Sequence, residues 1–285
     1  MKRIFLITLI AVTFFPGCQN KLVSIDAAPN TKSSTSIVSR AHWITVHVRN
    51  DETFTMLYEF FKDELQLPVF FHPEKWGGAR YTAILAGNVI LEICGPYPKT
   101  PIPGTELMAR CNTLIFRPFE SAQASADELA KRRINYEGPS KSDLQSINVF
   151  DLGMPVNISA TKEPGKDSKI GSLRKDLESR NGGPIGLKSV KELYIGYNSK
   201  EHLDKWINFI EPAKHKKNLW YLSEEPNLRF VEDETERIRA IVFKVESLKK
   251  ATDYLKHNGI LGNQTKKSVE IAKTKTGGLR IILEE

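Results

Sequence analysis

Residues 42–98 read HWITVHVRNDETFTMLYEFFKDELQLPVFFHPEKWGGARYTAILAGNVILEICGPYP. The first seven alternate between two sets of side chains, which is the period-2 signature of a strand. A helix should follow, because Asp51 can cap it and apolar residues from Phe54 to Leu65 recur at spacings of three and four. Pro68 should end this helix. Turn residues then separate three short runs with strand character, Val69–Phe71, Ala79–Leu85 and Val89–Cys94. The stretch therefore predicts a βαβββ unit.

Four features of this unit match a known pattern: His42 at the head of the first strand, Phe60-Phe61 late in the helix, Leu67-Pro68 after it, and the closing run GNVILE at 87–92. In these features the unit resembles a module of the vicinal oxygen chelate superfamily, which contains glyoxalases, extradiol dioxygenases, fosfomycin-resistance enzymes and bleomycin-binding proteins. The resemblance implies that the first and last strands of a module pair side by side. One side chain from each would then point into a shared concave surface and hold a divalent metal. His42 and Glu92 fall on those two positions.

Related patterns recur along the chain. A second unit runs from Asn112 to Ile158, and a third and a fourth begin near Val190 and Ile238. The resemblance therefore implies an α+β fold of tandem βαβββ modules that form two paired-module, glyoxalase-like domains. We expect these parts to be the first domain at 41–160, a linker with a short charged helix at 161–186, and the second domain at 187–285.

In the second module, Asn112 and Asn157 stand at the positions equivalent to His42 and Glu92. The resemblance implies that these four residues hold a divalent metal, Fe, Mn, Zn or Ni, and that Glu92 also takes part in proton transfer. An Asn side chain offers only a neutral carbonyl oxygen, so the site binds no metal if these substitutions inactivate it. Two plainer interpretations stay open: His42 as a partly exposed residue with a local hydrogen bond, and Glu92 as a charge that lines a pocket. Unbroken alternation would place His47 on the helix-covered face, opposite His42.

Two arginines of the second domain are candidates for ligand binding. Arg229 and Arg280 lie in its last predicted strands and suit a carboxylate or phosphate ligand, unless each only faces solvent. The first strands of this domain carry Leu193 and Ile241 near the matching positions, where a metal site would need His or a carboxylate. We therefore expect this domain to be a structural or ligand-shaping partner of the first.

Tyr81 and Cys94 are further candidates in the first domain. Tyr81 can donate to a bound oxyanion, although its spacing fits core packing equally well. Cys94 shares the strand face of Glu92 and is a candidate to touch a ligand. Cys94 and Cys111 can form a disulfide if their strands lie close together; the alternative is two buried thiols.

The N-terminus has the pattern of an export signal. Lys2-Arg3 precede an uncharged apolar run, Ile4 to Phe15, which is too short to span a bilayer. Gly17-Cys18 follow, and the whole resembles a bacterial lipoprotein signal in which Cys18 becomes the lipidated first residue. This implies a signal peptide at 1–18, a flexible tether at 19–40, and a protein anchored by lipid to a bacterial membrane, facing the periplasm or the exterior. The alternatives are an ordinary secretory leader or an uncleaved anchor, with Cys18 incidental in either case.

Composition limits the possible functions. The formal net charge is +7, but the basic residues are scattered and not interleaved with aromatic residues, so nucleic acid is not an expected partner. The chain contains no Gly-x-Ser-x-Gly elbow, no His-Glu-x-x-His helix and no phosphate-binding Gly-rich loop. The resemblance to the vicinal oxygen chelate superfamily implies a metal-dependent lyase, isomerase or dioxygenase for a small oxygen-rich substrate. The alternative is a metal-free protein that binds a small molecule or a partner on the same scaffold, as a monomer or a homodimer in either case.

Overall fold

Four strand–helix–three-strand modules follow one another in the computed structural model, which describes residues 35–76, 78–96, 109–139, 145–160 and 164–285. The first contains β1 (Val38–Val48), α1 (Asp51–Glu59), a π-helical turn (Phe60–Glu64), β2 (Val69–Trp76), β3 (Ala79–Ala86) and β4 (Val89–Gly95). The second contains β5 (Ala109–Pro118), α2 (Ala122–Lys131), β6 (Tyr136–Glu137), β7 (Ser146–Val149) and β8 (Val156–Ser159). The third contains β9 (Leu187–Tyr197), α4 (Lys200–Ile210), β10 (Lys214–Lys216), β11 (Leu219–Tyr221) and β12 (Asn227–Glu232). The fourth contains β13 (Ile238–Val245), α5 (Leu248–His257), β14 (Leu261–Gln264), β15 (Ser268–Ile271), a 3-10 turn (Lys273–Lys275) and β16 (Ile281–Glu284). The predicted fold class is confirmed.

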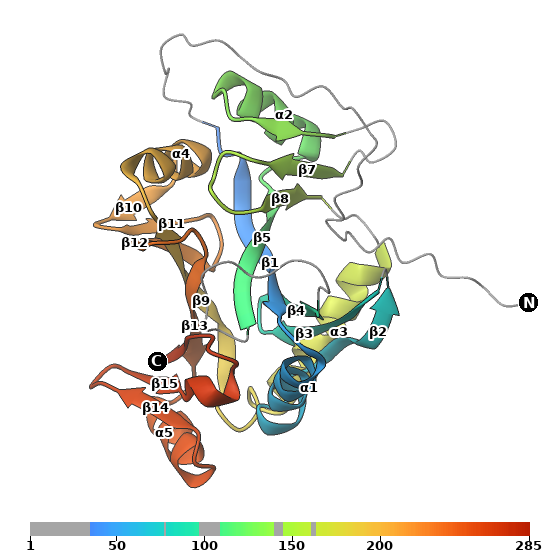
Figure 1. Cartoon of the computed structure of the whole chain (residues 1–285), viewed down its shortest axis with the longest axis vertical. Coiled ribbons are helices and arrows are strands. Elements are labelled where there is room, and N and C mark those ends of the chain that lie inside the picture. The colour runs from blue at the N-terminus through green and yellow to red at the C-terminus, as the bar shows by residue number, and fades with distance from the viewer. Residues whose placement is uncertain (1–34, 77, 97–108, 140–144, 161–163) are drawn as a thin grey trace, which may run out of the picture.

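Each module closes by pairing its last strand with its first. In the first module β4 runs parallel to β1, and β3 and β2 follow outward. The modules then pair through antiparallel first strands, β1 with β5 and β9 with β13. Strands β5 and β13 join the two halves into a single sheet (Figure 1). Among the described residues, Cys111 on β5 and Ile238 on β13 form the paired position between them. The architecture is therefore two paired-module halves in contact.

Side-chain caps set the helix starts. Asn50 caps α1, since its side chain accepts a hydrogen bond of 2.8 Å from the backbone N–H of Thr53. The prediction that Asp51 is the cap was wrong by one residue, and Asp51 instead lies in the first turn. Ser199 caps α4 as expected, because its hydroxyl accepts from the N–H of His202.

The segment predicted as a linker contains a longer helix than expected. Helix α3 spans Pro164–Ser179 and lies beside β2 and β3 of the first module (Figure 1). Ile170 and Leu173 of α3 pack against a buried cluster that contains Phe70 and Ile90. The linker helix therefore covers part of the first module, and the domain boundaries themselves stay a prediction.

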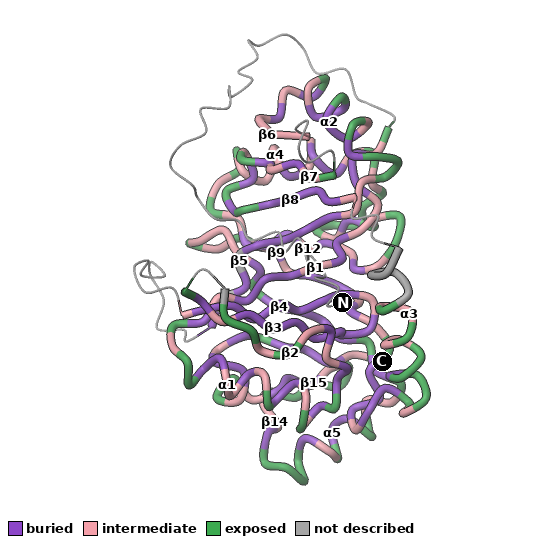
Figure 2. The backbone as a smooth tube through the Cα atoms, turned by 90° about the vertical axis from the view of Figure 1, so that its right-hand side faces the viewer, coloured by how far each residue is buried: buried purple, intermediate pink, exposed green. Residues whose placement is uncertain are grey.

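One large hydrophobic core contains residues from all four modules, such as Ile44, Leu114, Ile195 and Ile241. Figure 2 shows the central strands β1, β4 and β5 as largely buried, while much of α5 and β14 is exposed. Helices α1 and α2 contribute apolar side chains such as Leu57 to this core. Helices α1 and α2 therefore cover one face of the sheet of the first half, and α3 covers part of the other face.

Cys94 and Cys111 are both buried thiols. Cys111 lies opposite Val46 and belongs to the large core, whereas Cys94 lies opposite Tyr81 in a separate cluster. The two thiols face opposite sides of the sheet and form no disulfide. The alternative of two buried thiols is confirmed.

The predicted signal peptide, Cys18 and most of the predicted tether lie in residues 1–34, outside the described part of the chain. In the part that is described, we find no helix with both the length and the apolar character to span a bilayer.

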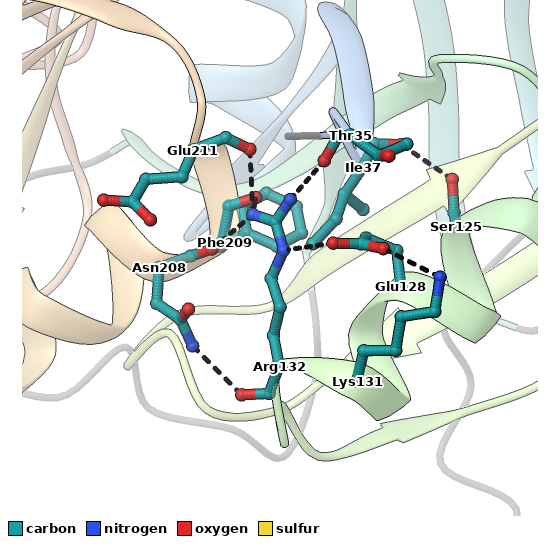
Figure 3. A network of polar contacts seen from close by, with 9 residues as sticks. All are labelled: Thr35, Ile37, Ser125, Glu128, Lys131, Arg132, Asn208, Phe209 and Glu211. Atoms are coloured by element: carbon teal, nitrogen blue, oxygen red, sulfur yellow. Dashed lines mark hydrogen bonds and ion pairs between the residues drawn. The ribbon is translucent and has the colours of Figure 1, made fainter. Parts of the chain in front are cut away.

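A buried arginine joins the second module to the third (Figure 3). The Nε of Arg132 donates to Glu128 at 2.9 Å, and its Nη1 donates to the carbonyls of Asn208 at 2.6 Å and Glu211 at 2.8 Å. Its Nη2 donates to the carbonyl of Thr35, just before β1. In return, the Asn208 amide donates to the carbonyl of Arg132. One side chain thus links α2, the C-terminal end of α4 and the start of the first strand.

We expect Arg132→Met to lower the free energy of unfolding by about 3 to 5 kcal/mol, because it removes the guanidinium from a buried ion pair and its carbonyl acceptors. Lys131→Met is the matched control, since the Lys131 side chain is 71% exposed and should change stability by only about 0.5 kcal/mol. Urea denaturation of the purified variants measures both. Equal effects of the two substitutions would show that the contacts of Arg132 do not contribute specifically to stability.

Candidate functional site

A β-bulge in β1 decides which side chains reach the face of the sheet that α1 and α2 do not cover. The register between β1 and β5 shifts between Ala41 and Trp43, so Ala41 and Ile44 both point into the core. Such a bulge adds one residue to a strand and reverses the alternation beyond it. Trp43 and Thr45 consequently point away from the core, and we call this face, which also carries Glu92, the inner face.

His47 also lies on the inner face. It pairs with Cys94 on β4, and its Nδ1 is 3.6 Å from Cys94 Sγ. The expectation that His47 lies on the helix-covered face was therefore wrong, because it assumed unbroken alternation from His42. The bulge is the physical reason for the difference.

Glu92 is the buried carboxyl group of the inner face. It lies on β4 directly opposite Thr45, and the residue is 6% exposed. Its Oε2 accepts hydrogen bonds from the Thr45 hydroxyl at 3.0 Å and from the Trp43 indole N–H at 3.2 Å. Burial raises the pKa of Glu92 to about 7, although both hydrogen bonds favour the ionised form. The group can therefore gain or lose a proton near neutral pH.

Sequence reasoning found Glu92 but missed its two donors. Thr45 is the polar residue of an otherwise apolar stretch of β1, and that pattern was the available signal. Trp43 could not be assigned to this face from alternation, because the bulge lies directly before it.

The predicted ligand residues Tyr81 and Cys94 lie on the same face as Glu92. Cys94 is two residues from Glu92 on β4, and Tyr81 lies opposite Cys94 on β3. Both are buried and pack with Ala79 and Phe71. Along β3 and β4 in the other direction, Ala83, Leu85 and Ile90 form the cluster that α3 covers. Glu92 thus lies between a pair of polar side chains and an apolar surface.

His42 is not brought to Glu92. It precedes Thr45, the residue opposite Glu92, by three positions, and Trp43 lies between them on β1. His42 is buried, where a partly exposed residue was one expectation, and its Nδ1 makes no hydrogen bond. Burial lowers the pKa of His42 to about 3, and the charges of Arg117 and Arg40 add to this effect. The imidazole is therefore neutral at physiological pH.

Asn157 lies on β8 opposite Ile115, and two strands separate it from β4. It is 2% exposed, and its Nδ2 donates to Asn148 Oδ1 at 2.9 Å while its own Oδ1 has no hydrogen-bond partner. Asn112 lies on β5, but its side chain is outside the described part of the chain. Of the predicted metal ligands, the described side chains do not converge on one point.

These residues do not fit the divalent metal that the resemblance implies. In the described ranges, no three His, Cys, Asp or Glu side chains are grouped so that they could hold a metal ion. His42 lies near two guanidinium groups, which repel a cation, and Glu92 accepts hydrogen bonds from two donors. A hard or borderline metal prefers anionic or imidazole ligands that converge. We therefore assign no chemical step to a metal at this site.

In the second half, the two arginines face carboxylates of the chain itself. Arg229 forms a two-contact ion pair with Glu192, with Nη2 to Oε2 at 3.1 Å. Arg280 donates to Glu270 Oε1 from Nη2 at 2.6 Å and from Nε at 2.9 Å. Glu192 and Glu270 are both buried. The guanidinium charges are therefore compensated within the chain, and the predicted anion ligand at these arginines stays a prediction.

Leu193 and Ile241, the residues expected near the ligand positions, point into the large core. The opposite face carries Tyr194 and the apolar Ala240, Val242 and Ile282. Burial raises the pKa of Tyr194, and Arg229 lies 5.4 Å from the centre of its ring. This face differs in chemistry from the inner face around Glu92.

Comparisons with known proteins identify the fold. No protein family model and no curated protein matches the chain. The homoprotocatechuate 2,3-dioxygenase of Arthrobacter globiformis has a TM-score of 0.59 at 14% identity, over 90% of this chain and 81% of that one. The 2,3-dioxygenase LapB of Pseudomonas sp. KL28 has a TM-score of 0.56 at 14% identity, over 87% and 92% of the two chains. The homoprotocatechuate 2,3-dioxygenase of Brevibacterium fuscum, solved with 3,4-dihydroxyphenylacetate, has a TM-score of 0.58 at 12% identity, over 90% and 83%. The chain therefore shares the fold of these dioxygenases.

We expect Glu92→Gln to change how stability depends on pH. The folded-state pKa of Glu92, about 7, lies above the ordinary value of 4.5, so the folded protein holds this proton more tightly than the unfolded chain. The wild type should therefore lose up to about 3 kcal/mol relative to Glu92→Gln as the pH rises through this window. Urea denaturation of both proteins at several pH values measures the difference.

The lowered pKa of His42 acts in the opposite direction, because stability from this group is lost as the pH falls below 6.5 towards about 3. That contribution is common to both proteins and cancels in the comparison. A stability difference that does not change with pH would show that Glu92 does not titrate in this window.

Proposed function

We propose that this chain is an exported, dioxygenase-like protein that takes up a small, oxygen-rich molecule on the inner face of its first domain and exchanges a proton with it through Glu92. The observation that carries the proposal is the buried Glu92 carboxyl group, oriented by Thr45 and Trp43. An acid or base is most effective when its pKa lies near the working pH, and the pKa of Glu92 is about 7. Export rests on the leader sequence and lipid attachment on Cys18.

The surroundings of Glu92 support a role in chemistry on a small molecule. Thr45 and Trp43 both donate to the same oxygen, so they fix the orientation of the carboxyl group. A positioned carboxyl group that can change its protonation state is suited to removing a proton from carbon or oxygen. Fold likeness alone does not provide an activity, because one scaffold hosts many reactions.

A second candidate is a metal-free binding protein on the same scaffold. The observation that favours it is the position of His42 beside Arg40 and Arg117, which suits an anion better than a cation. In this case Glu92 would bind a hydrogen-bond donor of the ligand and carry out no reaction. Proton exchange with the ligand separates the two candidates.

Proton exchange can be measured without knowing the reaction product. Wild-type protein in deuterium oxide is incubated with small 2-hydroxy and 2-oxo acids, catechols and hemithioacetals, and proton NMR follows deuterium incorporation at carbon. We expect incorporation into at least one of these compounds and a loss of about 10²-fold or more in Glu92→Gln, which is the usual contribution of a general base. Glu52→Gln is the matched control, because Glu52 is an exposed carboxylate in the first turn of α1, on the opposite side of the sheet of the same module. Exchange that persists in Glu92→Gln would contradict the role of Glu92, and binding without exchange would support the second candidate.

Metal content gives an independent test of whether His42 and Glu92 hold a metal ion. Elemental analysis of protein purified without chelator should find no near-stoichiometric metal that depends on Glu92, since His42 and Glu92 do not converge. The comparison is between wild type and Glu92→Gln. One equivalent of Fe, Mn, Zn or Ni that disappears in the variant would show that the site holds a metal and would overturn this prediction.

A further inference from the structure

Four strands of the first domain bring a polar patch together on the inner face. Arg40 on β1 lies opposite Arg117 on β5. Ser159 follows Ile158, the partner of Phe116, and so lies beside Arg117 on β8. Ser159 in turn lies opposite Ser146 on β7. These four polar side chains, Arg40, Arg117, Ser159 and Ser146, form one row across β1, β5, β8 and β7, which we call the arginine row.

A second row lies next to the arginine row and leads to Glu92. It contains Asn157, opposite Ile115 on β5, and Asn148, opposite Asn157 on β7. His42 lies at its β1 end, in the bulge before Trp43, the residue opposite Ile115. The next row along β1 and β5 is the pair Thr45 and Thr113, with Glu92 opposite Thr45. The patch and Glu92 therefore occupy consecutive rows of one face.

Among the described residues, four side chains with a buried polar atom that makes no hydrogen bond lie in these two rows, and a separate group lies at Thr235 and Arg237. The four atoms in the rows are His42 Nδ1, Asn157 Oδ1, Ser146 Oγ and Ser159 Oγ. Buried polar atoms in proteins almost always have a partner, so each exception calls for an explanation. His42, Asn157 and Ser159 are each more than nine-tenths buried. Their concentration on adjacent strands points to a polar ligand and not to isolated packing defects.

The charges of the patch favour an anion. The positive charges of Arg40 and Arg117 add to the effect of burial and lower the pKa of His42, so the imidazole stays neutral. Arg40 also pairs with Glu224 at 3.0 Å, and the Glu224 side chain is exposed. Guanidinium groups are planar donors that match carboxylate and phosphate oxygens. Two of them on opposing strands therefore define the end of the patch that suits an anionic group.

The other polar atoms favour hydroxyl groups. The Nδ2 of Asn157 already donates to Asn148, so the remaining oxygen accepts a hydrogen bond. The two serine hydroxyls can both donate and accept. The ligand should thus combine an anionic group with several hydroxyl groups.

We propose that the arginine row binds the anionic group of a small polyhydroxylated acid, while Asn157 and the serines bind its hydroxyl groups. The inference rests on the proposed function in one respect, since the same molecule would extend along the inner face towards Glu92. It adds the class of ligand, which neither the scaffold nor Glu92 defines.

Isothermal titration calorimetry with three probes tests this ligand class. Gluconate carries both a carboxylate and hydroxyl groups, sorbitol is its neutral counterpart, and hexanoate is an acid without hydroxyl groups. We expect the full chain to bind gluconate at least about tenfold more tightly than either of the others, because only gluconate satisfies both ends of the patch. Equal or weaker binding of gluconate overturns the inference.

Substitutions locate the binding. Arg117→Met should weaken gluconate binding by about tenfold or more, and Arg49→Met is the matched control because Arg49 is an exposed arginine just beyond the other end of β1. Thermal unfolding checks that each variant is folded. If Arg117→Met fails to fold, Asn157→Asp gives a second test, because it preserves the side-chain shape and adds a negative charge that should repel gluconate. Wild-type affinity in the folded variant overturns the inference.

Glu92→Gln separates this inference from the proposed function. Gluconate binding that survives in Glu92→Gln, with no deuterium exchange on any compound in wild type, would contradict the proposed proton transfer and leave the anion site supported. Glu92-dependent exchange on another compound, with no preference for gluconate, would support the proton transfer and overturn the anion site.

Discussion

One buried cation, Arg132, links the two halves of this protein through the acceptors that its guanidinium group needs. Arg132 is buried, so its guanidinium must find partners within the chain, and it finds them in Glu128 and in carbonyls of Asn208, Glu211 and Thr35. The carbonyls belong to the end of α4 and to the segment before β1, which are far apart in sequence. Because β1 is also the strand that pairs with β4 and β5, a contact at the surface of the core helps to position the strands of the inner face.

Within the first domain, the β1 bulge determines the chemistry of the inner face. One additional residue between Ala41 and Trp43 brings the Trp43 indole to Glu92 and places His47 beside Cys94. That additional residue is His42 itself, which lies near Arg40 and Arg117. The hydrogen bond that orients the Glu92 carboxyl group and the position of the His42 imidazole near two cations therefore both depend on this bulge.

Much of the fold could be predicted from the sequence, because period-2 alternation and turn residues mark each module and the resemblance supplied the pairing. The helix starts at Ser199 and near Asp51 followed from capping residues, with an error of one position at Asn50. The side chains that form the site were harder to predict from the sequence. A bulge leaves no trace in residue type, so alternation assigned His47 to the wrong face. The partners of Arg229 and Arg280 depend on strand register, which local sequence does not encode.

Helix α3 limits how far the four modules of this chain can be exchanged for one another. Four modules of one design should be interchangeable if each were complete in itself. The first module is not complete, because Ile170 and Leu173 of the linker helix cover its apolar patch around Phe70 and Ile90. Its inner face is thus built partly from sequence outside the repeat, so that recombination at module boundaries would separate the patch from its cover.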